Sequence, residues 1–179
     1  VRTLSADLHK FGFCPKPAST IFYRHEEDRE RGLFHFDAWP NGQFSTATLS
    51  GTRAGGAIAA AWAVMHHLGE DGYMAIARDL AAMTDAYVAG IEAIDGLYLL
   101  AAPHLTIINF AAEGFDIFAV AEAMGTRGWL PGLTQNPKGM HAMLSMFHEA
   151  GREDYLSDLA SCVEQVRGAN TSSDLKAVY

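Results

Sequence analysis

The chain has 179 residues, 49% of them apolar and 19% charged, which is enough apolar surface for a core and excludes wholesale disorder. Its net charge of −8 argues against nucleic-acid binding, which needs a basic face. The most lipid-like stretch, residues 54–65, is shorter than the about 20 residues that span a bilayer. Cys14 and Cys162 lie far apart, so they predict reduced thiols in a cytoplasmic protein rather than a disulfide or a zinc site.

The first third of the chain predicts little regular structure before a helix. Residues 18–24 are β-branched and aromatic and predict a strand, and the charged run 26–31 predicts a turn or a short helix. Residues 34–48 mix aromatics with Pro40, Asn41 and Gly42 without a steady period, which predicts an ordered loop. The small-residue pattern of residues 53–67 predicts a helix buried in a core.

The rest of the chain alternates helical and extended patterns, as in an α/β sandwich with a helical layer on one face. In chain order we predict a helix from Gly72 to Asp95, strands at 97–100 and 105–110, a helix at 116–127, an extended segment at 129–133, a strand at 140–147, a helix at 154–166 and a fraying polar tail at 168–179.

Lys10 is the residue with the clearest chemical potential. It follows Asp7 and His9, and Gly12 and Pro15 break the chain after it, so we expect a tight, partly buried loop. A lysine amine freed of its proton can form a Schiff base with an aldehyde such as pyridoxal phosphate. On composition alone, a solvated lysine on a surface turn is the favoured interpretation.

The surrounding motif changes that interpretation. Residues 5–16 read SADLHKFGFCPK, which resembles the cofactor-lysine segment of sphingosine-1-phosphate lyases, in the group II pyridoxal-phosphate decarboxylase family. The spaced Gly-Thr-Arg-Ala-Gly-Gly segment at residues 51–56 makes the resemblance specific. Further matching segments are residues 19–23, 39–44, Trp62, 67–73 and 105–148.

The resemblance implies the fold-type I architecture of pyridoxal-phosphate enzymes. Residues 1–65 would be the end of the large cofactor-binding domain, and residues 66–179 the small C-terminal α/β domain. It further implies a homodimer, because in this family the phosphate bound in one subunit is reached by a Gly-Thr segment of the neighbouring subunit. The roles it implies are Lys10 for covalent cofactor attachment, His9 for the phosphate, Gly51 and Thr52 for the phosphate across the dimer, and Tyr23 near the substrate.

Two further positions are weaker substrate-contact candidates. Phe44 stands where the lyase pattern has a tyrosine, and phenylalanine can neither donate nor accept a proton. His141 is expected to open a strand near the active site. The histidines lack the spacing of a metal site, so we predict no metal.

The resemblance also implies parts that lie upstream of the lysine in the family. They comprise the carboxylate for the pyridine nitrogen, the ring-stacking group and a phosphate loop, whereas nine residues precede Lys10 here. We therefore expect a fragment that by itself binds the cofactor weakly or not at all and is inactive. The expected activity of the full-length protein is carbon–carbon lysis of a phosphorylated amino alcohol. An amino-acid decarboxylase and a non-catalytic dimerisation module stay open as alternatives.

Overall fold

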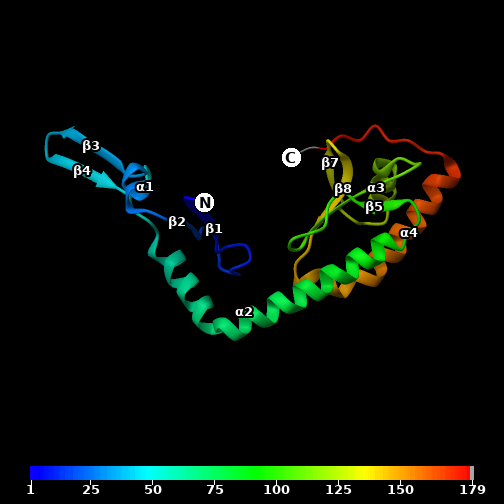
Figure 1. Ribbon diagram of the computed structural model, residues 1–179, viewed down its shortest axis with the longest axis horizontal. Helices are drawn as coiled ribbons and strands as arrows, with labels where there is room; N and C mark the ends of the chain where they lie inside the picture. Colours follow the sequence, from blue (N-terminus) through cyan, green and yellow to red (C-terminus); the bar gives the residue numbers. More distant parts are fainter. Residues whose placement is uncertain (178–179) are drawn as a thin grey trace. The chain divides into compact units, whose positions relative to one another are not determined.

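The computed structural model describes residues 1–177 and divides the chain into two compact units, Val1–Gly72 and Tyr73–Tyr179. Figure 1 labels the elements of each unit. The long helix α2, Gly55–Glu92, runs from the first unit into the second, and its backbone leaves helical geometry at Gly69, where φ is 59° and ψ is −174°. The two predicted helices are therefore confirmed as two segments of α2. The domain boundary after residue 65 stays a prediction.

The first unit contains two antiparallel strand pairs and one short helix. The strand predicted at residues 18–24 is confirmed as β2, and the charged run 26–31 forms the short helix rather than a turn. The polar strand β1 was not predicted, because its sequence lacks a run of β-branched residues. The elements are β1 (Thr3–Asp7) paired with β2 (Ser19–Tyr23), α1 (Glu26–Arg31), and β3 (Phe34–Trp39) paired with β4 (Gly42–Thr46).

The predicted loop at residues 34–48 is wrong, because most of it forms the hairpin of β3 and β4. Phe36 lies opposite Phe44 across the two strands. Gly42 follows the turn with a φ of 99°, a left-handed conformation that glycine adopts without steric cost. The register shifts between Phe36 and Trp39, and such a bulge breaks the period of two that would have identified a strand.

The expectation of a buried helix at residues 54–65 is also wrong for the described part of the chain. Ile58 and Trp62 are 64% and 61% exposed, whereas Ala61 is buried. These side chains border an apolar groove of about 560 Å³ within the first unit. An apolar composition predicts burial only where a packing partner exists, and within this unit one side of the helix has none.

The second unit contains a four-stranded antiparallel sheet with the strand order β5-β6-β8-β7. The predicted helix at 116–127 is confirmed as α3, and the Asp116 carboxylate caps it by accepting from the Phe118 N–H at 2.9 Å. The elements are β5 (Leu97–Leu99), β6 (Ile107–Ala112), α3 (Ile117–Thr126), β7 (Gly132–Gln135), β8 (Lys138–Met143), the 3-10 helix η1 (Met146–Gly151) and α4 (Arg152–Ala169).

Several boundaries in this unit differ from the predicted ones by two residues or more. β7 begins at Gly132, so most of the extended segment predicted at 129–133 precedes the strand. The strand predicted at 140–147 ends at Met143, because η1 begins at Met146 with Ser145 as its N-cap. α4 continues to Ala169 and ends at Asn170, which adopts a left-handed C-cap conformation. The tail is described to residue 177, so its last two residues lie outside the described part.

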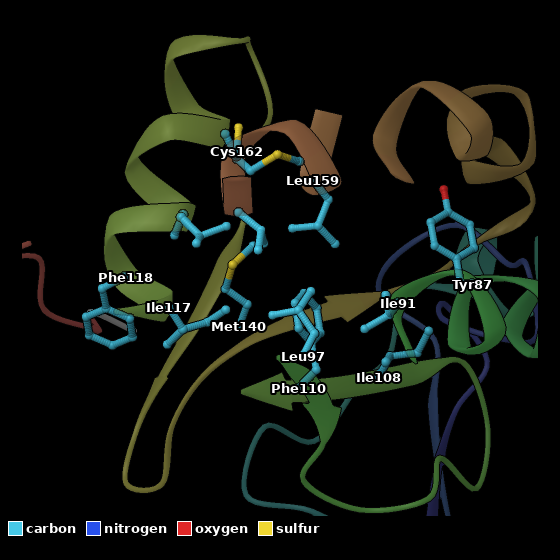
Figure 2. Close-up of a cluster of buried hydrophobic side chains, with 14 of the residues drawn as sticks. Tyr87, Ile91, Leu97, Ile108, Phe110, Ile117, Phe118, Met140, Leu159 and Cys162 are labelled. Atoms are coloured by element: carbon cyan, nitrogen blue, oxygen red, sulfur yellow. The ribbon is translucent and has the colours of Figure 1, made fainter. Parts of the chain in front are cut away.

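The core of the second unit lies between one face of the sheet and the helices α3 and α4 (Figure 2). Ile108 and Phe110 alternate along β6 and are fully buried on that face. Val120 and Met124 of α3 and Leu159 of α4 are also fully buried in this cluster. The predicted sandwich with a helical layer on one face of the sheet is therefore confirmed.

Candidate active site

Lys10 lies in a tight turn between β1 and β2. Its N–H donates to the Asp7 carbonyl at 3.0 Å, and the Cys14 N–H donates to the Leu8 carbonyl at 2.9 Å. A Cβ at Gly12 would come within 2.5 Å of the Leu8 oxygen, so only glycine lets the chain return this closely. The predicted tight loop is therefore present, and its backbone is fixed by its own hydrogen bonds.

The side chain of Lys10 is more exposed than a partly buried loop would suggest. It is 65% exposed, and its Nζ lies 3.0 Å from Oδ2 of Asp7, which is itself 34% exposed. The Lys10 side chain is exposed because this ion pair at the surface holds its amine at the edge of the turn rather than beneath it. The amine is consequently accessible to an aldehyde that approaches from solution.

Ser19 is a site residue that the sequence analysis missed. Its hydroxyl donates to Oδ1 of Asp7 at 2.5 Å, and this bond, followed by the bond from Lys10, lowers the pKa of the Asp7 carboxyl. The antiparallel register places Ser19 directly opposite Asp7, so a correct pairing of β1 with β2 would have revealed it. Asp7 is therefore held as a carboxylate that anchors the Lys10 amine.

Replacing Ser19 with alanine should raise the Asp7 pKa towards its ordinary value, since the largest cause of the shift is lost. A lowered carboxyl pKa stabilises the fold above the unfolded pKa, and that stabilisation disappears as the pH falls through the folded pKa. The stability difference between variant and parent should accordingly vanish at low pH. Carboxyl-carbon NMR titration measures the shift, with Ser45→Ala on β4 as the control. An unchanged Asp7 pKa in Ser19→Ala would contradict the assignment.

His9 is half-buried and its ring is oriented by the backbone of β2. Nδ1 lies 2.9 Å from the Ala18 carbonyl oxygen and 3.4 Å from the Ala18 nitrogen, so the shorter contact assigns the hydrogen to Nδ1. Nε2, 3.9 Å from Asp7 Oδ2, then carries a hydrogen only when the ring is doubly protonated. His9 can therefore donate to a phosphate from Nε2 as an imidazolium.

Gly51 and Thr52 lie in the loop before α2 and not at the capping position of that helix. Gly51 has a φ of 69°, which favours glycine, and Thr52 is exposed. α2 begins at Gly55, so Thr52 lies three residues before the helix and is not its N-cap. Arg53 donates from Nη1 to the Gly51 carbonyl at 3.0 Å and also contacts Thr48 Oγ1. The Arg53 side chain therefore shapes this loop, and the Thr52 hydroxyl is left at the surface.

Tyr23 lies on β2 and Phe44 on β4, and neither belongs to the turn that carries Lys10. The register places Tyr23 opposite Thr3, at the far end of the β1–β2 ladder from Asp7. Phe44 contacts Trp39 with ring centroids 6.3 Å apart on the β3–β4 hairpin, and it is 44% exposed. The turn between β1 and β2 therefore contains Lys10, whereas Tyr23 and Phe44 belong to other parts of the first unit.

His141 belongs to the second unit and lies in the middle of β8 rather than at its start, which corrects the expected position. The register places it between Asn109 of β6 and Gly132 of β7. Its ring faces away from the core, because the buried Phe110 and Met140 occupy the opposite face of the sheet. Within residues 1–177, no three His, Cys, Asp or Glu side chains are grouped to hold a metal ion.

Comparisons with solved structures place this architecture among pyridoxal-phosphate enzymes. A sphingosine-1-phosphate lyase from Burkholderia pseudomallei matches with a TM-score of 0.88 and 33% identity, over 95% of this chain and 39% of that one. A glutamate decarboxylase from Lactobacillus brevis matches with a TM-score of 0.74 at 14% identity, over 96% of this chain and 42% of that one, which shows the fold alone. The predicted α/β, fold-type I class is therefore confirmed.

Sequence comparisons give relatives of two kinds, lyases and a decarboxylase. A rice sphingosine-1-phosphate lyase is 34% identical over 167 residues, covering 93% of this chain and 31% of the relative. A probable L-aspartate decarboxylase from Thermococcus gammatolerans is 30% identical over 165 residues, covering 91% of this chain and 42% of the relative. No protein-family model matches. Over most of its length the chain is homologous to sphingosine-1-phosphate lyases, and it spans about a third of the rice lyase's length.

Proposed function

We propose that this chain is part of a pyridoxal-phosphate-dependent carbon–carbon lyase that cleaves a phosphorylated amino alcohol by a retro-aldol reaction. The observation that carries the proposal is Lys10, presented by a fixed turn in a chain that is 33% identical to a lyase of the same fold. The substrate class follows from the names of these relatives, sphingosine-1-phosphate lyases. No helix among residues 1–177 has the length and apolarity to cross a membrane.

The residues of the turn fit the chemistry of pyridoxal phosphate. The cofactor needs an accessible amine for covalent attachment, and Lys10 Nζ is exposed on a backbone that hydrogen bonds hold in place. It also needs donors for its phosphate, for which we propose His9 as an imidazolium, the Gly51 backbone and the Thr52 hydroxyl. A charged donor makes the stronger hydrogen bond to a phosphate oxygen.

The proposed mechanism gives each candidate site residue of this chain a role. The cofactor, when bound, supplies an electron sink for the carbon–carbon bond that breaks. Lys10 gives up and takes back a proton at Nζ, and Asp7 orients that amine through its 3.0 Å contact. Ser19 keeps Asp7 ionised and in place. Tyr23 is the proposed hydroxyl group near the substrate, and His141 a proposed substrate contact.

An amino-acid decarboxylase is the second candidate function, and the archaeal decarboxylase relative favours it specifically. The two activities would use the same lysine but leave different products, carbon dioxide or an aldehyde. A non-catalytic dimerisation module is the third. An assay for both products, run on the complete protein that contains this chain, separates the three.

We propose a homodimer in which Thr52 reaches the phosphate held by the other subunit. Thr52→Val removes the hydroxyl at nearly constant volume, and it should weaken cofactor binding by about 1.5–3 kcal/mol, the worth of a hydrogen bond to a charged group. Fluorescence titration of the complete protein with pyridoxal phosphate measures this. Thr46→Val, at the end of β4, is the matched control. A fully active monomer would contradict the shared site.

Phe44 is proposed to set substrate preference. Its ring packs on Trp39 and carries no polar atom, so a substrate group that needs a hydroxyl partner would be left unpaired. Phe44→Tyr should therefore alter the ratio of kcat/KM for a phosphorylated long-chain amino alcohol against acidic and aromatic amino acids. If the parent already cleaves the phosphorylated substrate efficiently and Phe44→Tyr changes nothing, position 44 does not determine specificity.

We propose a cytoplasmic location and small-molecule partners. Cys14 and Cys162 are both free and buried, which suits a reducing compartment. The net charge of −8 disfavours nucleic acid as a partner. Fractionation of the source cells, followed by detection of the protein in each fraction, tests the location.

A further inference from the structure

The second unit contains a cavity of about 450 Å³ whose walls are mainly aromatic and aliphatic. Trp129 and Tyr155 form one wall, with ring centroids 5.2 Å apart and nearly perpendicular planes. Leu130 and Met143 stand at its rim and are 99% and 66% exposed. Such walls suit the apolar part of a small ligand.

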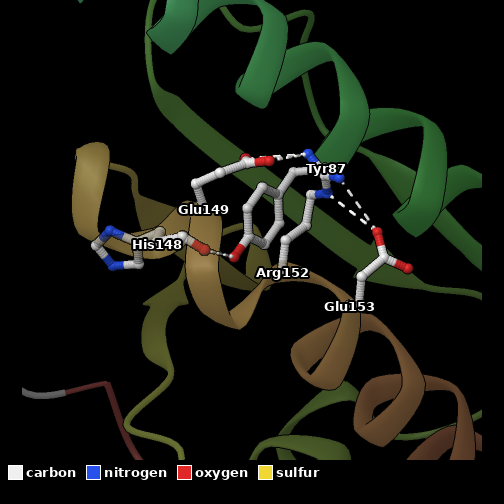
Figure 3. Close-up of polar contacts among 5 residues, drawn as sticks. All are labelled: Tyr87, His148, Glu149, Arg152 and Glu153. Atoms are coloured by element: carbon white, nitrogen blue, oxygen red, sulfur yellow. Dashed lines mark hydrogen bonds and ion pairs between the residues drawn. The ribbon is translucent and has the colours of Figure 1, made fainter.

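Two polar side chains that line this cavity, His148 and Tyr155, can donate a hydrogen bond. The Ser145 N–H donates to Nδ1 of His148 at 2.9 Å, so the hydrogen of the neutral His148 ring resides on Nε2. The Tyr87 hydroxyl fixes this segment by donating to the His148 carbonyl at 2.8 Å (Figure 3). Burial raises the pKa of Tyr155, so its hydroxyl stays protonated. Among residues 1–177 that hydroxyl has no hydrogen-bond acceptor of its own, and it is free to donate to a ligand.

The His141 ring lines the cavity and fills the space that Gly132, its cross-strand neighbour, leaves open. Gly132 lies directly opposite His141, and a Cβ at position 132 would come within 2.5 Å of both Cε1 and Nε2 of the imidazole. Contacts this short do not occur, so any larger residue at 132 must displace the ring. Gly132 therefore determines where the His141 imidazole stands.

No acidic side chain of the cavity lining would repel an anion. Among the described residues that line it there is no carboxylate, and no lysine or arginine either. Glu149, the chain neighbour of His148, is neutralised by Arg152, whose Nη1 lies 2.7 Å from its carboxylate (Figure 3). Donors without an acidic competitor are complementary to an oxyanion, and the aromatic walls to a hydrocarbon chain or ring.

We propose that this cavity binds a small amphiphilic anion, an alkyl or aryl group that ends in an oxyanion, with His141 as the contact to the head group and Gly132 as its positioning residue. The lyase proposal uses His141 of this cavity as a substrate contact, and its other residues all belong to the first unit. The test needs neither pyridoxal phosphate nor turnover, so its failure would remove the His141 contact and leave the roles proposed for the first unit unaffected.

The test is a titration of the 179-residue chain with octanoate, followed by NMR of the histidine Cε1–H groups. We expect saturable shifts at His141 and His148 and none at the exposed His104. His141→Ala should weaken binding about tenfold or more, since a hydrogen bond to a charged group is lost. Gly132→Ala should move the His141 signal and weaken binding similarly. Gly125→Ala, where a Cβ meets no atom within 4 Å, should change neither.

Two control ligands and one double variant make the test decisive. Acetate has the head group alone and octanamide the neutral chain, and both should bind more weakly than octanoate. If Gly132→Ala fails to fold, the double variant Gly132→Ala/His141→Ala, in which the clash is removed, should fold and bind as weakly as His141→Ala. Unchanged affinity in Gly132→Ala or His141→Ala, equal shifts at His104, or octanamide binding as tightly as octanoate would overturn the proposal.

Discussion

Replacing Lys10 with alanine should abolish covalent attachment of pyridoxal phosphate and lower turnover of the complete protein by about 10²–10⁴-fold, the usual contribution of a positioned proton-transfer group. The effect should be this large because the proposed mechanism assigns both attachment and proton transfer to one amine. Borohydride reduction followed by peptide mapping of the parent should place the cofactor on Lys10, and product formation measures the loss of turnover.

Lys16→Ala and Lys138→Ala are the matched controls. Lys16 lies in the same segment of the first unit, six residues beyond Lys10. Lys138 pairs with Asp116 at 2.6 Å in the second unit, where it has a structural contact of its own. Cofactor found on either of these lysines, or a Lys10→Ala variant that keeps full activity, would contradict the site.

Phe110→Ala should lower the free energy of unfolding of the second unit by about 3–5 kcal/mol. Phe110 is fully buried between the sheet and its helices, and truncation leaves a cavity in addition to the lost transfer energy. Urea denaturation followed by near-ultraviolet circular dichroism measures the change.

Phe147→Ala is the control for this prediction. It removes the same ring from a side chain that is 92% exposed, so its effect should remain within about 0.5 kcal/mol. Equal losses in the two variants would mean that Phe110 does not belong to the core around which the unit folds.

The helices and strands of the second unit follow closely from the sequence because that unit contains its own core. The alternation of Ile108 and Phe110 and the helical spacing of Leu159 and Val163 both correspond to side chains that are buried in one cluster. The boundaries that differ are local. η1 begins at Met146 because of a capping box between Ser145 and His148, whose histidine at the third position is not the usual Glu or Gln.

The strands of the first unit were harder to predict, because they follow from pairing between strands rather than from a buried core. These strands are short and are stabilised mainly by pairing. The bulge near Trp39 interrupts the alternation that would have predicted β3, and the polar sequence of β1 gives no strand pattern that would have predicted its pairing with β2. The lysine motif identified Lys10 and His9, but Ser19 became visible only through the register that sets it opposite Asp7. Side-chain partners across a ladder depend on that register, which spacing along the sequence does not fix.

The strand order of the second unit has a consequence for solubility during synthesis and storage. Both edges of the sheet are its shortest strands, β5 with three residues and β7 with four. An edge strand offers unpaired backbone groups on which another chain can build, and short edges offer few of them. Pro131 lies just before β7 and has no N–H to donate, so it shortens that template further. The two longest strands of this sheet, β6 and β8, are thereby protected in its interior from intermolecular strand addition.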